Sequence, residues 1–199
     1  PTCPVVDPNG HWMREMEIEE LENGGEYKTN KDWFTQQLKF TFTPLAGWTI
    51  YAEGAIRVAN EKTYQSQIPI YNYGVDNTPF IRDSGYGTVT NVYDSRFRQN
   101  YYATNIYTDY IRSFGNHNAK VLVGLNYERY NQDALSGQGY NLTAENKPYL
   151  SQTQERHSVS DSYWRRATAG YFARLNYDYN AKYLAEFNIR YDGSSRFLS

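Results

Sequence analysis

The sequence predicts an all-β fold, an antiparallel transmembrane β-barrel segment of about six strands in three hairpins. Three observations indicate this fold. Apolar and polar residues alternate over runs of about ten residues, which is the period of a strand with one apolar and one polar face. Short turns alternate with long polar connections along the chain. Aromatic residues make up 17 % of the chain and gather near the ends of the expected strands, as in the aromatic girdles of membrane barrels.

The last hairpin, with strands at 166–179 and 182–192, has the clearest alternation. Leu175 follows the apolar series and Arg174 the polar one, and the pattern resumes after a two-residue turn at 180–181. A transmembrane strand needs about 9–11 residues, whereas strands of soluble proteins average about 5–6. The length of these strands and their charged second face therefore favour a strand that has lipid on one side and water on the other.

Two further hairpins precede it. Their strands are expected at 33–43 and 48–58, joined by a turn at 44–47, and at 101–114 and 119–130, joined by a turn at 115–118. Phe172, Leu184 and Leu122 interrupt the polar series as exceptions. The positions expected to face lipid are Leu38, Phe40, Ile50, Val123, Leu175 and Phe187. Those expected to face the barrel lumen are Arg57, Asp109, Arg174, Glu186 and Arg190.

The remaining segments are expected to be loops. Residues 1–32 are read as an extracellular loop with a short helix near 16–22, and 59–99 and 131–165 as long extracellular loops. Outer-membrane barrels have short periplasmic turns and long extracellular loops, which sets the orientation. The candidate residues for binding substrate or partner are Tyr64, Tyr71, Tyr73, Tyr86 and Tyr93. Such rings can stack on sugars, pack the loop, or contact a partner protein, and the sequence leaves these roles open.

Charge, hydropathy and cysteine content limit the kinds of protein to which the chain can belong. The net charge of −2 gives no reason to expect nucleic acid as a partner. The mean hydropathy of −0.80 is polar, but a barrel places apolar residues only at every second position of its strands. Cys3 is the one cysteine, so no intramolecular disulfide forms. The chain begins Pro1-Thr2-Cys3 without an apolar leader, so we expect it to be an internal part of a longer protein.

No catalytic, metal or cofactor site is expected. His11, His117 and His157 lack the spacing of metal ligands. The carboxylates of the strands are read as an alternating polar wall rather than as the paired acids of a glycosidase. Arg190 and Arg196 flank a strand end, where either partner contact or satisfied charges would explain them. Two alternatives remain: a soluble all-β carbohydrate-binding module with Tyr-rich loops, and an enzyme that cleaves glycans.

Several strings resemble SusC/RagA-type TonB-linked outer-membrane transporters. They include YFARLNYDY at 171–179, RYDGSSRF at 190–197, FTPLAGW at 42–48, KVLVGLNYE at 120–128 and DPNGHW at 7–12. The resemblance implies a barrel of about 22 strands with a plug in its lumen, in the outer membrane of a Gram-negative-type cell. It also implies import of glycans or peptides, driven by the TonB complex, with a SusD-like surface lipoprotein as partner. The plug and the remaining barrel strands would lie outside this chain.

Overall fold

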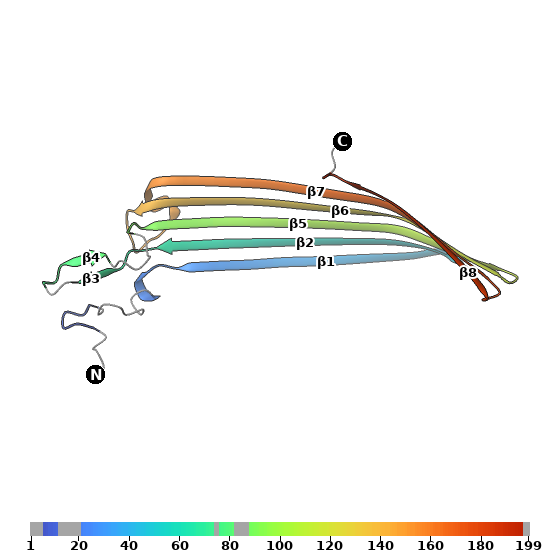
Figure 1. Ribbon diagram of the computed structural model, residues 1–199, viewed down its shortest axis with the longest axis horizontal. Coiled ribbons are helices and arrows are strands. Elements are labelled where there is room, and N and C mark those ends of the chain that lie inside the picture. Colours follow the sequence, from blue (N-terminus) through green and yellow to red (C-terminus); the bar gives the residue numbers. More distant parts are fainter. Residues whose placement is uncertain (1–5, 12–20, 74–75, 82–87, 197–199) are drawn as a thin grey trace. The chain divides into compact units, whose positions relative to one another are not determined.

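The computed structural model describes residues 6–11, 21–73, 76–81 and 88–196, with Arg156 described by its backbone alone. Six long strands form one sheet in the order β1-β2-β5-β6-β7-β8, so each strand lies beside the next one of the six along the chain (Figure 1). They are β1 (Tyr27–Leu45), β2 (Trp48–Gln67), β5 (Asn91–Phe114), β6 (His117–Leu142), β7 (Thr153–Tyr179) and β8 (Tyr183–Ser194). This confirms the predicted antiparallel sheet of three hairpins.

Shorter elements lie in the connections. β3 (Tyr71–Tyr73) and β4 (Pro79–Ile81) form a separate antiparallel pair, and a 3-10 helix, η1 (Leu150–Gln152), precedes β7. The described residues contain no helix of the length and apolar character that crossing a membrane requires.

The chain divides into two compact units, and each is described by itself. The wall unit comprises residues 32–60, 98–133 and 163–199, and the loop unit comprises residues 1–31, 61–97 and 134–162.

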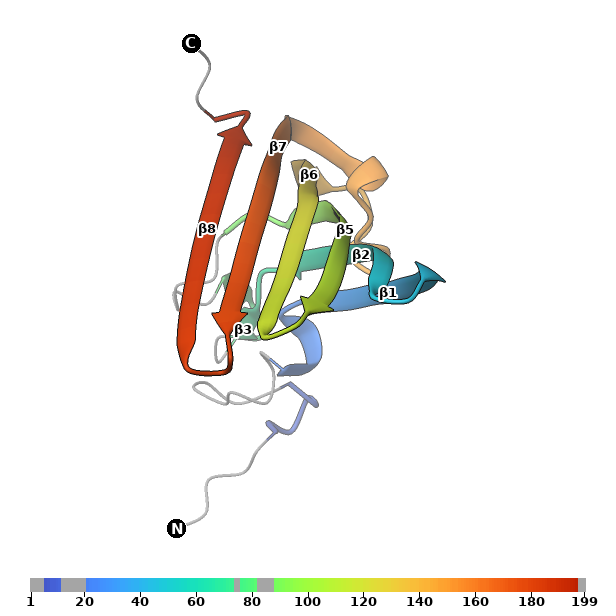
Figure 2. The same ribbon diagram turned by 90° about the vertical axis from the view of Figure 1, so that its right-hand side faces the viewer.

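The pairing of β7 with β8 shows how the wall unit separates its two faces. The register runs from Thr168 opposite Ser194 to Tyr179 opposite Tyr183, and Figure 2 shows the two strands as one hairpin. Residues directly opposite each other in an antiparallel pair project to the same face. The apolar series of β7 therefore meets the apolar series of β8, and the polar series meet on the other face.

The three turns of the wall unit are shorter than, or different from, those predicted. The first contains residues 46–47 and the second residues 115–116, with Gly47 (φ 80°) and Gly115 (φ 61°) in the left-handed region that glycine tolerates. The prediction of the third turn is wrong by one residue, because this turn contains residues 180–182 rather than 180–181. There the backbone N–H of Lys182 donates to the carbonyl oxygen of Tyr179 at 3.0 Å.

The predicted long loops are wrong over much of their length. β2 continues to Gln67 and β5 begins at Asn91, inside the stretch 59–99, and strands likewise occupy much of 131–165. Residues outside the predicted strand bounds are polar on both sides, so alternation disappears although the backbone pairing continues. Periodicity therefore detected only the parts of each strand that have one apolar face.

The N-terminal loop prediction also needs correction. β1 begins at Tyr27, six residues before the predicted strand start at Trp33. Residues 21–23 are helical, while residues 12–20, which contain most of the predicted short helix, lie outside the described part of the chain.

The described residues enclose almost no hydrophobic core. Only Ile70 and Val92 are buried among them as hydrophobic residues, whereas Leu38 is 71 % and Phe187 63 % exposed. A soluble domain of about 150–200 residues would bury roughly 70 % of the surface that its unfolded chain exposes. A soluble carbohydrate-binding module does not explain this distribution, because its apolar side chains would have to pack against one another.

Candidate functional site

One face of the wall unit carries a network of polar side chains across β1, β2 and β5. Lys39 forms an ion pair with Glu53, with 3.0 Å between Nζ and Oε1. The hydroxyl of Tyr107 donates to the same carboxylate at 3.0 Å, and Nε of Arg57 donates to the hydroxyl of Thr35 at 3.3 Å. Arg57 lies four residues from Glu53 on β2, and this even spacing places Arg57 on the same face as the Lys39–Glu53 pair.

The network continues from β5 onto β6. The amide nitrogen of Asn126 donates to Oδ1 of Asn105 at 2.6 Å, and Nζ of Lys120 lies 3.1 Å from Oδ2 of Asp109. The residue Asp109 is buried, with 8 % of its surface exposed, so its charge is balanced where water is least accessible. Asp109 and Tyr107 are two residues apart on β5, so their side chains project to the same face.

On β7 and β8 the same face is held by side-chain amides and carboxylates. Nε of Arg174 donates to Oδ1 of Asn188 at 2.7 Å, and the amide nitrogens of Asn188 and Asn176 each donate to Glu186 at 2.6 Å. Arg190 forms an ion pair with Asp192 at 2.7 Å. The five residues predicted to face the lumen thus occupy one face.

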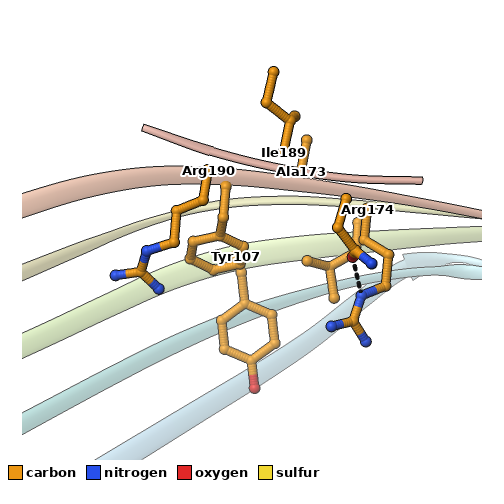
Figure 3. Close-up of a pocket in the computed structure, with 8 residues that line it drawn as sticks. Tyr107, Ala173, Arg174, Ile189 and Arg190 are labelled. Atoms are coloured by element: carbon orange, nitrogen blue, oxygen red, sulfur yellow. Dashed lines mark hydrogen bonds between the residues drawn. The ribbon is translucent and has the colours of Figure 1, made fainter. Parts of the chain in front are cut away.

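The opposite face is apolar and exposed. Figure 3 shows Arg174, Arg190 and Tyr107 on one side of the sheet and Ala173 and Ile189 on the other. Large hydrophobic residues of this second face, all at least 36 % exposed, are Leu38, Phe40, Phe42, Ile56, Ile106, Val121, Val123, Leu125, Leu175, Phe187 and Ile189. The wall unit therefore has one face suited to an apolar solvent and one suited to water.

A groove of about 450 Å³ lies on the polar face. It is lined by Tyr107, Leu122, Phe172, Arg174, Asn188 and Arg190, together with Ala173 and Ile189 (Figure 3). Gly124 leaves the space in which the ring of Phe172 lies, because a Cβ atom there would be 2.5 Å from Cζ of Phe172 and 2.6 Å from Cβ of Tyr107. A glycine on β6 thus makes room for an aromatic ring on β7.

The groove gathers two of the apolar residues that interrupt the polar series, Phe172 and Leu122. The third, Leu184, lines a second groove of about 420 Å³ beside Ile111 and Lys120. Sequence reasoning treated these residues as exceptions and missed that they form two apolar patches. The available signal was the glycine at 124, but its position opposite Phe172 requires the register between β6 and β7.

A pocket of about 570 Å³ in the loop unit contains two of the predicted tyrosines, Tyr71 and Tyr73. Carboxylates, prolines and a serine line the rest of it: Glu22, Glu26, Glu145, Pro69, Pro148 and Ser66, with Asn23, Gly25, Ile68, Ile70 and Asn146. The residues Tyr71 and Tyr73 are 38 % and 39 % exposed, so both remain partly accessible. We call this the tyrosine pocket.

The other predicted tyrosines differ in their places. The hydroxyl of Tyr64 donates to the carbonyl oxygen of Pro148 at 2.6 Å, so Tyr64 supports one wall of the tyrosine pocket. Tyr93 is half-buried on β5 and does not line the pocket, and Tyr86 lies outside the described residues. The structure brings together Tyr71 and Tyr73, supported by Tyr64, but not Tyr93.

A histidine covers one of these rings. His11 stacks on Tyr73 with 3.7 Å between ring centroids and 9° between ring planes. Asp7 holds the turn before it by accepting the backbone N–H groups of Asn9 and His11 at 2.8 and 2.9 Å. The N–H of His11 is the main reason that the pKa of the Asp7 carboxyl lies below its usual value.

The described residues do not place three or more His, Cys, Asp or Glu side chains together as a metal site would require. The two other histidines have different partners. Nδ1 of His117 lies 2.6 Å from the hydroxyl of Tyr177, and Nε2 of His157 lies 2.8 Å from the hydroxyl of Thr153.

Comparison with known proteins gives two related sequences, while no protein-family profile matches the chain. The chain is 34 % identical over 94 residues to the TonB-dependent receptor SusC of Bacteroides thetaiotaomicron, which covers 47 % of the chain. It is 30 % identical over 106 residues to the TonB-dependent receptor P3 of Formosa agariphila, which covers 46 % of the chain. Each match spans 9 % of the relative's length.

Solved structures share the fold over nearly the whole chain. The RagAB peptide transporter superposes with a TM-score of 0.77 and 18 % identity, over 100 % of this chain and 21 % of that one. The RagAB peptide importer in its closed-closed state gives a TM-score of 0.76 and 18 % identity, over 97 % and 22 %. The chain is thus similar in sequence to part of two TonB-dependent receptors, SusC among them, and it shares the fold of a β-barrel segment of RagAB.

Proposed function

We propose that this chain forms part of the wall of a transporter in the outer membrane of a Gram-negative-type cell. The observation that carries the proposal is the separation of faces in the wall unit. Exposed apolar side chains cover one face, and hydrogen-bonded charged side chains cover the other. In this arrangement Leu38, Phe40, Ile50, Val123, Leu175 and Phe187 contact lipid. Arg57, Asp109, Arg174, Glu186 and Arg190 then face a water-filled lumen.

The outermost strands support a larger barrel. In the main sheet, β1 neighbours only β2 and β8 neighbours only β7, so each has one edge without a partner within the described sheet. Unpaired backbone groups are not tolerated in the hydrocarbon core, because each costs several kcal/mol. Further strands of the same transporter pair with these two edges, in a closed barrel of about 22 strands with a plug in its lumen.

The complete transporter imports glycans or peptides with energy from the TonB complex. The sequence relatives are TonB-dependent receptors, and RagAB is a peptide importer. The short turns at 46–47, 115–116 and 180–182 face the periplasm, and the connections within 59–99 and 131–165 face the outside, because outer-membrane barrels have short periplasmic turns and long extracellular loops. There Tyr71 and Tyr73, with the other candidate tyrosines Tyr64, Tyr86 and Tyr93, contact the substrate or a SusD-like surface lipoprotein.

Lysine substitution on the two faces tests the wall assignment. In the complete transporter that contains this chain, Phe187→Lys would place a charge against lipid, at a cost of about 2–4 kcal/mol near the bilayer midplane. We expect much less folded transporter in the isolated outer membrane. Asn188→Lys is the matched control. The side chain of Asn188, the next residue along β8, projects to the polar face, so a lysine there should leave the amount of folded transporter unchanged. Equal loss from both changes would contradict the proposal.

A transport assay tests the import step. Cells that carry the complete transporter should take up a labelled glycan or peptide, and deletion of the gene for TonB should abolish uptake while leaving the transporter in the membrane. Uptake that continues without TonB would contradict the energy coupling.

A further inference from the structure

Three arginines lie on the apolar face of the wall unit, at one end of its apolar stretch. Arg98 lies on β5, Arg129 on β6 and Arg165 on β7, which are three neighbouring strands of the sheet. Each is separated by an even number of residues from an exposed apolar residue of its own strand, so the two side chains share a face. These apolar residues are Ile106 on β5, Leu125 on β6 and Leu175 on β7.

The register between β6 and β7 follows from contacts at two places. The backbone N–H of Asn180 donates to the carbonyl oxygen of Asn116, so these two residues lie opposite each other. Eight residues away on each side of the pairing, a Cβ atom at Gly124 would meet the ring of Phe172. Both contacts fit one register, so neither strand has an extra residue between them.

The same register brings Arg129 and Arg165 together. It places Arg129 opposite Ala167, which is two residues from Arg165. Diagonal neighbours of this kind are about 7–8 Å apart, which is within the reach of long side chains. Asn131, opposite Arg165, accepts a hydrogen bond from Nε of Arg129 at 3.1 Å through its Oδ1. This bond holds the Arg129 side chain and leaves its terminal nitrogens as donors.

Little acidic charge balances this arginine cluster, which comprises Arg98, Arg129 and Arg165. Among the described residues, none of the three arginines forms an ion pair. Asp133 lies opposite Arg98 in the pairing of β5 with β6, but no ion pair joins the two described side chains. Arg98 and Arg165 are also exposed. The cluster therefore keeps an excess of positive charge that an anion can reach.

Cations on the polar face are balanced within the chain. Lys39 pairs with Glu53 at 3.0 Å, and Lys120 pairs with Asp109 at 3.1 Å. The arginine cluster differs from these pairs, because it gathers three cations on the face that is otherwise apolar. Its excess charge points to an anion from outside the chain.

The position of the cluster along the strands corresponds to the depth of lipid headgroups. Arg165 lies 14 residues before Tyr179, the last residue of β7. At about 3.4 Å per residue and a tilt of about 40°, this separation spans roughly 36 Å across the membrane. The apolar band of a barrel is about 25 Å tall, and a bilayer with its headgroups is about 40–45 Å thick. With Tyr179 at the interface beside the short turns, Arg165 lies among the headgroups of the opposite leaflet.

We propose that the arginine cluster binds the terminal phosphate group of a membrane lipid. A phosphate monoester carries a charge of about −1.5 to −2 at pH 7 and three acceptor oxygens, so it can accept from Arg129 and Arg165 together. The planar guanidinium donates two parallel hydrogen bonds to such a group. The acyl chains of the lipid lie along the apolar residues of the same face. This inference rests on the proposed function, because a lipid reaches the cluster only if this face borders the bilayer.

Lipids with a terminal phosphate belong to two chemical classes. The phosphate is carried either by a glycerolipid, as in phosphatidic acid, or by a glycolipid, as in lipid A. The group that the arginines recognise is the same in both, and the probes below distinguish the two sources. Inorganic phosphate tests whether the lipid body is needed.

The test measures lipid binding to the complete transporter in detergent by native mass spectrometry. The probes are phosphatidic acid and lipid A, compared with phosphatidylglycerol, which is a phosphate diester, with diacylglycerol, which has no phosphate, and with inorganic phosphate. We expect at least one of the first two to bind more tightly than the other probes. The double variant Arg129→Gln/Arg165→Gln should weaken that lipid about tenfold or more and leave diacylglycerol unchanged.

Two further variants separate recognition from general charge and from folding. Arg112→Gln removes an exposed arginine near the other end of β5, an even number of residues from Arg98, and should leave the affinity unchanged. Arg165→Gln alone removes a side chain without a partner among the described residues, so it should weaken binding without shifting the midpoint of denaturant unfolding.

Four results would overturn the proposal. They are equal binding of diacylglycerol and both terminal-phosphate lipids, binding of inorganic phosphate as tight as that of the lipids, unchanged lipid affinity in the double variant, and an equal loss of affinity in Arg112→Gln. A stronger response to phosphatidic acid than to lipid A would identify the lipid as a glycerolipid, and the reverse order would identify it as a glycolipid.

A labelling experiment separates failure of this inference from failure of the proposed function. Phe187→Cys should react with a thiol reagent that is confined to the membrane. If it does so while Arg129→Gln/Arg165→Gln binds both terminal-phosphate lipids normally, the phosphate site is wrong and the wall assignment stands. If Phe187→Cys reacts only with a water-soluble reagent, the faces are reversed and both proposals are wrong.

Discussion

Phe172 lies across Gly124, with the ring so close that a Cβ atom at Gly124 would sit 2.5 Å from Cζ of the phenylalanine. This relationship between β6 and β7 explains why an aromatic residue occupies the polar series of β7. The missing side chain on one strand provides the space that the ring on the next strand fills, and the ring becomes the floor of a groove.

Gly124→Ala should destabilise the complete transporter by about 1–3 kcal/mol, because overpacking forces side chains out of their preferred conformations. The midpoint of denaturant unfolding measures this change. Phe172→Ala in the same chain should recover part of the loss but not all of it, because Cβ of Tyr107 also lies 2.6 Å from the added atom.

Gly54→Ala is the control for that prediction. A Cβ atom at Gly54 meets nothing within 4 Å, so this substitution should leave the midpoint nearly unchanged. If both alanines shift the midpoint equally, backbone freedom rather than packing of Phe172 explains the glycine at 124.

Replacing the exposed rings of the tyrosine pocket should weaken binding of substrate or lipoprotein by the complete transporter. Tyr71→Ala and Tyr73→Ala each remove an aromatic contact, which is worth about 0.5–1.5 kcal/mol, or roughly twofold to tenfold in affinity. Val159→Ala, at a residue that is 76 % exposed and does not line the pocket, serves as the control. Unchanged affinity in both tyrosine variants would mean that the pocket has no part in binding.

The turn at Asp7 should loosen in acid. The folded-state pKa of Asp7 is lowered, so its contribution to stability is fully present above the unfolded value of about 3.9 and is lost as the pH falls through the folded value. Hydrogen exchange measured for the N–H groups of Asn9 and His11, which Asp7 accepts, should lose protection in that range. Asp7→Asn should show no such pH-dependent step. A step of the same size in that variant would assign the change to another group.

The sequence predicted those parts of the fold in which one side of a strand differs from the other. Leu175 and Arg174 were assigned to opposite faces because solvents of different polarity impose alternation on a strand. The ends of β2 and β5 at Gln67 and Asn91 were missed, because polar residues on both sides leave no period. Strand pairing is formed by backbone groups and therefore continues without a pattern in the side chains.

Sites made by distant segments were predicted only in part. All the candidate tyrosines were chosen because the connection 59–99 is rich in tyrosine. Tyr71 and Tyr73 line one pocket because both lie on the short strand β3, whereas Tyr93 lies elsewhere, on β5. The groove at Phe172 was missed because it depends on which residue of β6 lies beside β7, and no local pattern contains that register.

Alternating accessibility along β8 tests the central claim most directly. In a cysteine-free version of the complete transporter, single cysteines replace Phe187, Asn188, Ile189 and Arg190 in turn. Each is then exposed to a water-soluble thiol reagent and to one confined to the membrane. We predict that the membrane-confined reagent modifies positions 187 and 189 and the water-soluble reagent modifies 188 and 190. Water-soluble labelling of 187 and 189, or protection of all four positions from both reagents, would contradict the account of this sheet as a membrane wall.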